Sequence, residues 1–244
     1  MFLQDPPPTP YDLRFSVFGI PVRVHPWFWA IALMLGLNPR GQNRPDDVLI
    51  WIVAVFVSIL IHELGHAFAA RACGWPPRIT LYAMGGLASF SPTYHDSKRQ
   101  IAISAAGPAA GFLFAAVVIG LLVGFGYMSN VFGVQITDRP TRVLDNARLV
   151  TLINDLLWIN VGWGVINLMP VIPLDGGHIA TEVLATISPM QGRGWALLLS
   201  AVTGAALAVA GLVYLQSIFV ALMFGYLAYQ SYTAWQGRYA GGRW

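Results

Sequence analysis

The sequence predicts an all-α polytopic membrane protein with about six transmembrane helices and a small β segment at the membrane interface. Three observations indicate this fold class. Hydrophobic residues make up 56% of the 244 residues and charged residues only 10%, whereas about 25% of the residues of a soluble domain are charged. The mean hydropathy is +0.60. Apolar runs of about 17 to 25 residues, the length needed to cross a hydrocarbon core, recur along the chain.

The composition limits the kinds of molecule that this protein is expected to bind. The formal net charge is +3 and the isoelectric point is near 9.2. The basic residues are scattered over connecting segments and form no stripe, so a nucleic-acid partner is not indicated. A small basic excess is instead typical of the cytoplasmic loops of a membrane protein. The single cysteine, Cys73, rules out an intramolecular disulfide and is expected to fill apolar space beside a helix end.

Residues 1–24 are expected to form an N-terminal tail and an interfacial strand. The first 13 residues are rich in proline and carry acids where a signal peptide would have a basic region and an apolar core. The first spanning helix is therefore expected to act as an uncleaved signal. Residues 14–24 favour β structure and are interrupted at Gly19-Ile20-Pro21, which predicts one or two strands.

Residues 25–236 are expected to form one membrane domain of six spans. The first span is short, and the second carries a cluster of ionisable groups near its end. Residues 74–97 are too polar and too short to cross a bilayer and contain a β-favouring run, so an interfacial strand or hairpin is predicted there. A polar loop, 128–148, follows the third span. The spans are predicted at about 25–37, 48–73, 100–127, 149–191, 195–213 and 214–234, and the second to fourth form the core.

The fourth span is interrupted at 167–177 by two prolines and two glycines, and a turn is predicted at 192–194. Non-helical backbone at membrane depth is tolerated only where it is buried in protein or lines water. With six spans, nine basic residues fall on the side of the two termini and five on the other. Both termini of this multi-pass protein of the cell membrane are therefore predicted to be cytoplasmic.

The segment HELGH, residues 62–66, carries the strongest chemical signal. Histidines at i and i+4 share one face of a helix, so the imidazoles of His62 and His66 can reach one metal ion. Glu63 can accept a proton from a water whose pKa zinc lowers toward 7. Three ionisable groups so close together in an apolar helix are costly and usually mark a functional site. The competing interpretation is a polar cluster that hydrogen-bonds to neighbouring helices.

Catalytic zinc usually has three protein ligands and one open position, so a third ligand is needed. Most other acids lie in polar loops, Asp155 lies near the outer start of the fourth span, and Glu182 lies beyond its break. Asp175 lies within the break, in NLMPVIPLDGGH, at a depth similar to that of the two histidines. The sequence therefore predicts one Zn²⁺ per chain with Asp175 as its third ligand. The remaining histidines are interpreted as non-ligands: His25, His95 and His178.

The two motifs, HELGH in one span and NLMPVIPLDGGH in a later one, resemble the signature motifs of the site-2 protease family of intramembrane zinc metalloproteases. The segment FGIPVRVHP, the glycine pair at 85–86 and Ala106-Gly107-Pro108 at the start of the third span are also similar to that family. The resemblance covers most of the chain, in a compact form without a PDZ or CBS domain. Many relatives have an asparagine near position 111, where this chain has Gly111, so the role of that asparagine is in doubt here.

The resemblance implies a zinc metalloendopeptidase that hydrolyses peptide bonds of transmembrane substrates, as in regulated intramembrane proteolysis. His62, His66 and Asp175 are then the zinc ligands and Glu63 is the general base. Asn167 is implied to donate a hydrogen bond to the developing oxyanion or the scissile backbone. An interhelical hydrogen bond is the alternative role for this residue. The implied partners are a membrane-spanning protein substrate and the lipid bilayer, and no nucleic acid.

Other functions stay open on the sequence alone. The main alternative is a non-catalytic zinc-binding membrane receptor or chaperone on the same fold, against which the presence of Glu63 argues. A metal transporter would need polar side chains through several spans, but the first, fifth and sixth carry almost no ionisable groups. A zinc protease of the prenyl-protein type would need a glutamate from a second helix, and none fits. The segment 78–90 has two equal interpretations: an edge, through 79–84, for strand addition by substrate, or a hairpin that seals the zinc site.

Overall fold

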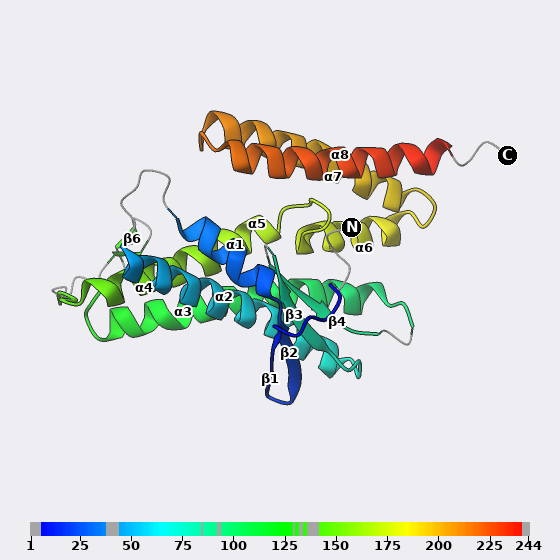
Figure 1. Cartoon of the computed structure of the whole chain (residues 1–244). Coiled ribbons are helices and arrows are strands. Elements are labelled where there is room, and N and C mark those ends of the chain that lie inside the picture. Colours follow the sequence, from blue (N-terminus) through cyan, green and yellow to red (C-terminus); the bar gives the residue numbers. More distant parts are fainter. Residues whose placement is uncertain are drawn as a thin grey trace. The chain divides into compact units, whose positions relative to one another are not determined.

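The computed structural model of the chain describes residues 6–37, 44–83, 85–91, 94–128, 130–131, 134–135 and 142–240 (Figure 1). The chain divides into two compact units. The first comprises Met1–Pro92 and Ala106–Gly164, and the second comprises Thr93–Ala105 and Val165–Trp244. The first unit carries the HELGH segment, and the second carries the broken segment at 167–177.

A four-stranded sheet in the first unit has the order β1-β2-β3-β4. Its two antiparallel hairpins are joined by the parallel pairing of β2 with β3. Phe18 and Gly19 turn the first hairpin with φ of 51° and 73°, the positive values that a two-residue type I′ turn requires. The small β segment predicted from the sequence is thus confirmed as a sheet. Its strands are β1 Leu13–Val17, β2 Ile20–Val24, β3 Arg78–Tyr82 and β4 Gly85–Ser89.

β3 is an inner strand of this sheet. It pairs with β2 on one side and with β4 on the other, and Ile79, Thr80 and Leu81 are buried. The interpretation of segment 79–84 as a free edge is therefore wrong for residues 79–82, because both hydrogen-bonding sides of β3 are already used. Met84, at the end of that segment, lies outside the described residues. The outer strand on this side of the sheet is β4.

A hydrogen-bonded cluster fastens the N-terminal segment to β2. Thr9 donates to the Asp12 carboxylate from its backbone N–H and from its hydroxyl, at 3.0 and 2.7 Å, and Arg23 donates to it at 3.3 Å. Arg23 also donates to the carbonyl of Pro6 at 2.8 Å. Desolvation alone would raise the pKa of Asp12, but these hydrogen bonds and the positive charge of Arg23 outweigh it and lower the pKa to about 2.

The core of the first unit lies where the sheet meets α1 and α2. α2 packs on β3 and β4 and also against α4, while α1 packs on α2 and β3. Buried apolar side chains of β2, β3, α1 and α2 fill the contact, among them Val22, Phe28, Ile59, Leu64 and Leu81. The helical elements as far as residue 167 are α1 Pro26–Gly36, α2 Pro45–Ala72, α3 Ser97–Gly124, α4 Ala147–Trp158, the π-helical turn η1 Ile159–Trp163 and α5 Gly164–Asn167. A short two-stranded ribbon is formed by β5 Asn130–Val131 and β6 Val134–Gln135.

The second unit is built mainly from α6 Asp175–Ile187, α7 Gly192–Val213 and α8 Ile218–Ala240, of which α7 and α8 lie side by side (Figure 1). The turn predicted at 192–194 is wrong, because these residues form the first turn of α7 and the chain turns at 188–191. The glycine at 192 serves close packing instead. A side chain on Gly192 would overlap the backbone of Leu184.

Four helical segments of the described chain are long and apolar enough to cross a membrane: Pro45–Ala72, Ser97–Gly124, Ala147–Asn167 and Gly192–Val213. They correspond to the second, third, fourth and fifth predicted spans. α1 is apolar but has only 11 residues, and α8 is not among the four, so the predicted count of six is not confirmed. At most 39% of the residues of any of these apolar windows are buried inside the protein.

Candidate metal centre

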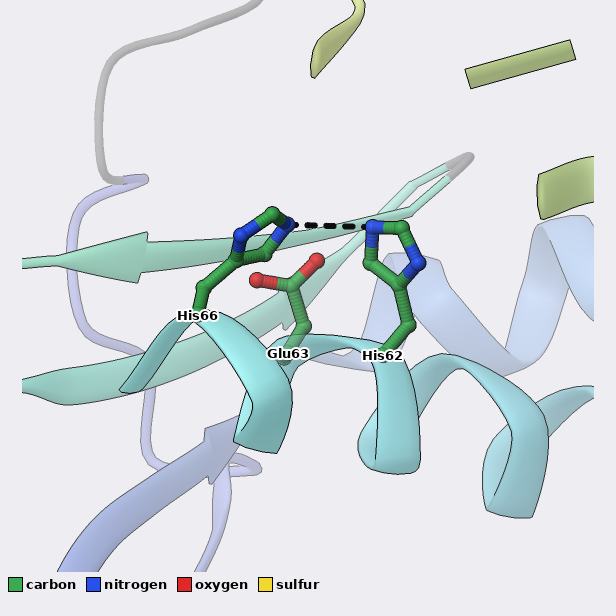
Figure 2. A group of neighbouring side chains, drawn as sticks. All are labelled: His62, Glu63 and His66. Carbon is green, nitrogen blue, oxygen red and sulfur yellow. Dashed lines mark hydrogen bonds between the residues drawn. The ribbon is translucent and has the colours of Figure 1, made fainter. Parts of the chain in front are cut away.

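The metal centre is built on α2, which places HELGH on its inner face. His62, Glu63 and His66 are 8%, 5% and 7% exposed. Their potential ligand atoms all lie within 4.8 Å of one another. Figure 2 shows the Glu63 carboxylate between the two imidazoles, whose Nε2 atoms face each other at 3.1 Å. The i, i+4 spacing therefore brings the two imidazoles close together, as the sequence predicts.

This donor set fits zinc. Two nitrogens bound to a tetrahedral zinc ion, each at about 2.0–2.1 Å, lie about 3.3 Å apart. The observed separation of 3.1 Å between the Nε2 atoms of His62 and His66 is close to that value. The imidazoles of His62 and His66 can therefore bind a common metal ion without a large rotation.

Three glycines let backbone approach these side chains closely. A methyl group on Gly107 of α3 would overlap the imidazole of His66 and lie 2.8 Å from Nε2 of His62. A methyl group on Gly86 of β4 would overlap the side chain of Glu63, 2.6 Å from Oε1. A methyl group on Gly65 of α2 would overlap the carbonyl of Ala106. Only glycine at these positions allows α2 to contact α3 and β4 around the site.

A second layer of polar groups lies beside His62. Asn160 in η1 donates from Nδ2 to the hydroxyl of Ser58 and to the carbonyl of Leu156, each at 2.8 Å. Ser58 precedes His62 by one helical turn, and a cavity of about 10 Å³, room for roughly one water, touches all three side chains. Neither Ser58 nor Asn160 was predicted as a site residue. The signal was available, since a buried asparagine in an apolar span is costly and commonly functional.

The other two predicted site residues belong to the second unit. Asn167 is the last residue of α5 and is buried. Asp175 is the first residue of α6, and its Oδ2 atom is buried. Their participation in the same site as the HELGH histidines remains a prediction.

The remaining histidines have other surroundings. His25 caps α1, since its Nδ1 accepts a hydrogen bond from the N–H of Trp27 at 3.2 Å. His95 lies 3.2 Å from a carboxylate oxygen of Glu182, and His178 is exposed. Within the described residues none of the three joins a cluster of metal-ligating side chains.

Comparison with known proteins gives a consistent result. A model of peptidase family M50 matches residues 50–211. The chain is 32% identical over 190 residues to a Synechocystis protein that bears a zinc metalloprotease name, and 29% identical over 178 residues to the zinc metalloprotease MJ0392 of Methanocaldococcus jannaschii. These matches cover 73% and 72% of this chain but 45% and 46% of the two relatives. The chain thus spans about half the length of the curated relatives it matches.

Among solved structures, the chain is similar to the site-2 protease from Methanocaldococcus jannaschii, with a TM-score of 0.53 and 26% identity over 91% of this chain and 95% of that one. The apolar helices and this match make the chain a multi-pass membrane protein. The names of the relatives specify zinc, which agrees with the donor set of α2. The segment that the family model matches contains both HELGH and Asp175. The chain belongs to peptidase family M50.

Proposed function

We propose that this chain is a zinc-dependent endopeptidase that hydrolyses peptide bonds of membrane-spanning proteins at or within the bilayer. The observation that carries the proposal is the buried cluster of His62, Glu63 and His66 on α2, a helix long and apolar enough to cross a membrane. Burying these groups in such a helix is costly unless they serve a site. Membership of a peptidase family favours peptide hydrolysis over other reactions that use zinc.

His62, His66 and Asp175 hold the zinc ion in this proposal, through two Nε2 atoms and one carboxylate oxygen. Two histidines and one carboxylate are an established ligand set for catalytic zinc, and they leave one position open. When bound, zinc supplies a Lewis acid that lowers the pKa of water and polarises the scissile carbonyl. The α2 histidines are preorganised for this role by their 3.1 Å separation.

Glu63 is the general base. As water attacks the carbonyl carbon and the new C–O bond forms, the water proton passes to the Glu63 carboxylate. Glu63 then gives this proton to the amide nitrogen as the C–N bond breaks. The contact with Gly86 limits where the carboxylate can lie. Asn167 donates an amide hydrogen to the oxyanion that develops on the carbonyl oxygen.

The substrate segment binds in an extended form along β4. A peptide bond inside a helix is poorly accessible because its carbonyl is hydrogen-bonded and packed, so the substrate must unwind first. β4 is an outer strand of its sheet, and its Gly86 lies against Glu63. A strand added to this edge would carry its backbone past the general base.

The chain crosses the membrane six times within one domain, 25–236, with α1 and α8 as its first and last spans and both termini in the cytoplasm. The excess of nine basic residues over five supports this orientation. Cys73 is the only cysteine, so single cysteines placed near either end in a Cys73→Ala background report sidedness. Labelling of both ends from the periplasmic or extracellular side would refute the orientation.

The decisive experiment is cleavage of a single-span model substrate by the purified protein in detergent, with Glu63→Gln beside wild type and bound zinc quantified in both. We expect wild type to cut, Glu63→Gln not to cut, and both to hold about one zinc ion. If both hold zinc and neither cuts any of a panel of substrates, a non-catalytic zinc-binding receptor is the better description. If wild type holds no zinc, the metal site is wrong.

A further inference from the structure

We propose that Ser200 of α7 and Ser231 of α8 position the backbone segment that carries Asp175, so that these two helices help to build the metal centre. The inference rests on the proposed function, in which Asp175 is a zinc ligand. It assigns a role to the part of the chain that follows the HELGH helix and the broken span, and all of the residues that carry it lie in the second unit.

The observation is a buried chain of hydrogen bonds. The backbone N–H of Ile172 donates to Oγ of Ser200 at 2.8 Å, and the hydroxyls of Ser200 and Ser231 lie 2.8 Å apart. Ser200 is 0% exposed and Ser231 is 4% exposed. Two hydroxyls buried between apolar helices cost free energy unless they are hydrogen-bonded. Here they satisfy each other and a backbone donor from outside the helix pair.

Ile172 is the residue through which the backbone of the broken segment hydrogen-bonds to another helix. Proline has no backbone N–H, so between Pro170 and Pro173 only Val171 and Ile172 can donate. The N–H of Val171 is used locally, in a bond to the carbonyl of Met169 at 2.7 Å. The N–H of Ile172 goes to Ser200 instead. The serine pair therefore accepts the one backbone N–H of this stretch that hydrogen-bonds to another helix.

The backbone at Ile172 packs directly against the start of α6. A methyl group on Gly177 would lie 2.6 Å from the backbone nitrogen of Ile172 and 2.6 Å from the carbonyl of Val171. A methyl group on Gly176 would overlap the carbonyl of Leu168. The first turn of α6 thus rests on the broken segment with no side chain between them. Asp175 begins that turn, so it cannot keep its place if the segment moves.

Loss of the Ser200 hydroxyl would leave the N–H of Ile172 without its acceptor. The segment would then shift to find water or another acceptor, and Asp175 would shift with it. Removal of an outer group that orients a metal ligand typically lowers metal affinity by 10- to 100-fold. Ser200 and Ser231 are positioning residues in this sense, because they touch neither substrate nor metal and act through the backbone.

The test measures zinc affinity, by competition with a chelator, in the full-length protein in detergent. We expect Ser200→Ala to weaken zinc binding by about 10- to 100-fold. Ser231→Ala should weaken it less, because Ser200 keeps its bond to Ile172. Gly204→Ala is the matched packing control. It lies one turn from Ser200, and its new methyl would press on Ala228 of α8 at 3.1 Å without touching the hydroxyl pair.

A double-mutant cycle with Asp175→Ala decides whether the serine acts through the ligand. The inference predicts that Ser200→Ala has no further effect on zinc affinity once Asp175 is absent. It is overturned if Ser200→Ala matches wild type or Gly204→Ala, or if its effect persists undiminished in Asp175→Ala. If Asp175→Ala itself binds zinc like wild type, the ligand assignment of the proposed function fails instead. Should Ser200→Ala not fold, Ser200→Cys, which keeps the size of the side chain but offers a much weaker acceptor, run through the same cycle gives the same decision.

Discussion

Replacement of Gly107 by alanine should remove zinc from the site while leaving the fold intact. The added methyl group would lie 2.8 Å from Nε2 of His62 and would overlap the imidazole of His66. A zinc ion bound to both nitrogens would lie about 2.0–2.1 Å from each. The methyl group and the ion therefore compete for space close to the two Nε2 atoms.

The size of the effect follows from these distances. Non-bonded heavy atoms settle at about 3.5–4.0 Å, so the methyl of Gly107→Ala must gain roughly 0.7 Å from His62 and more from His66. Zinc ligands tolerate about 0.2 Å, so the two imidazoles cannot move aside that far with the site preserved. We expect zinc affinity to fall by at least about 100-fold, beyond the usual effect of an outer group. Alanine favours a helix by about 1 kcal/mol, which partly offsets an overpacking cost of about 1–3 kcal/mol.

The assay pairs zinc stoichiometry after dialysis with cleavage of a single-span substrate and with thermal unfolding in detergent. Gly120→Ala and Gly124→Ala are matched controls on the same helix, because a methyl group at either position meets nothing within 4 Å. Both should bind zinc and cut as wild type does. A Gly107→Ala protein that holds one zinc ion with wild-type affinity would refute the reasoning, since the space before the two imidazoles could not then be where the metal lies.

Three further predictions follow from the same structure. Gly86→Ala should keep zinc but lower kcat, by roughly 100-fold if Glu63 is displaced as the base, whereas Gly85→Ala, with open space around it, should behave as wild type in the same kinetic assay. Removal of zinc by a chelator should abolish cleavage, and added Zn²⁺ should restore it; chelator-resistant cleavage would contradict the proposed chemistry. Because the pKa of Asp12 falls from 3.8 to about 2 on folding, its stabilising contribution is complete above about pH 4 and is lost as the pH falls toward 2. Melting temperatures of wild type and Asp12→Asn should therefore converge across that interval, and a constant difference between them would contradict the sign.

The parts of the site that lie on one helix could be predicted from the sequence. The i, i+4 spacing of His62 and His66 fixes their common face once the segment is helical, and the apolar run around them makes the helix certain. The break around Asp175 was also visible, because two prolines and two glycines within eleven residues do not continue a regular helix. These are local features, and local rules of helix geometry are sufficient for them.

Features that depend on tertiary contacts could not be predicted. The pairing of Asn160 with Ser58 joins residues far apart in the chain, and nothing in either segment specifies the partner. The inner position of β3 depends on its parallel pairing with β2, whereas the sequence of the segment alone fits an edge strand equally well. The number of spans could not be predicted from composition either, because a short apolar helix such as α1 can cross the membrane with tilt, lie at the interface or cover the sheet.

The same contacts explain why the site depends on glycine as much as on histidine. Between apolar helices and lipid there is little hydrophobic driving force, so small residues that permit close approach hold membrane helices together. In this chain Gly107 and Gly86 bring backbone against the imidazoles and the carboxylate, which excludes lipid and bulk water from the groups that must hold a metal and a proton. Gly176 and Gly177 do the same under Asp175. The HELGH helix and the first turn of α6 therefore rest on backbone rather than on side chains, and backbone in packed helices has few alternative positions.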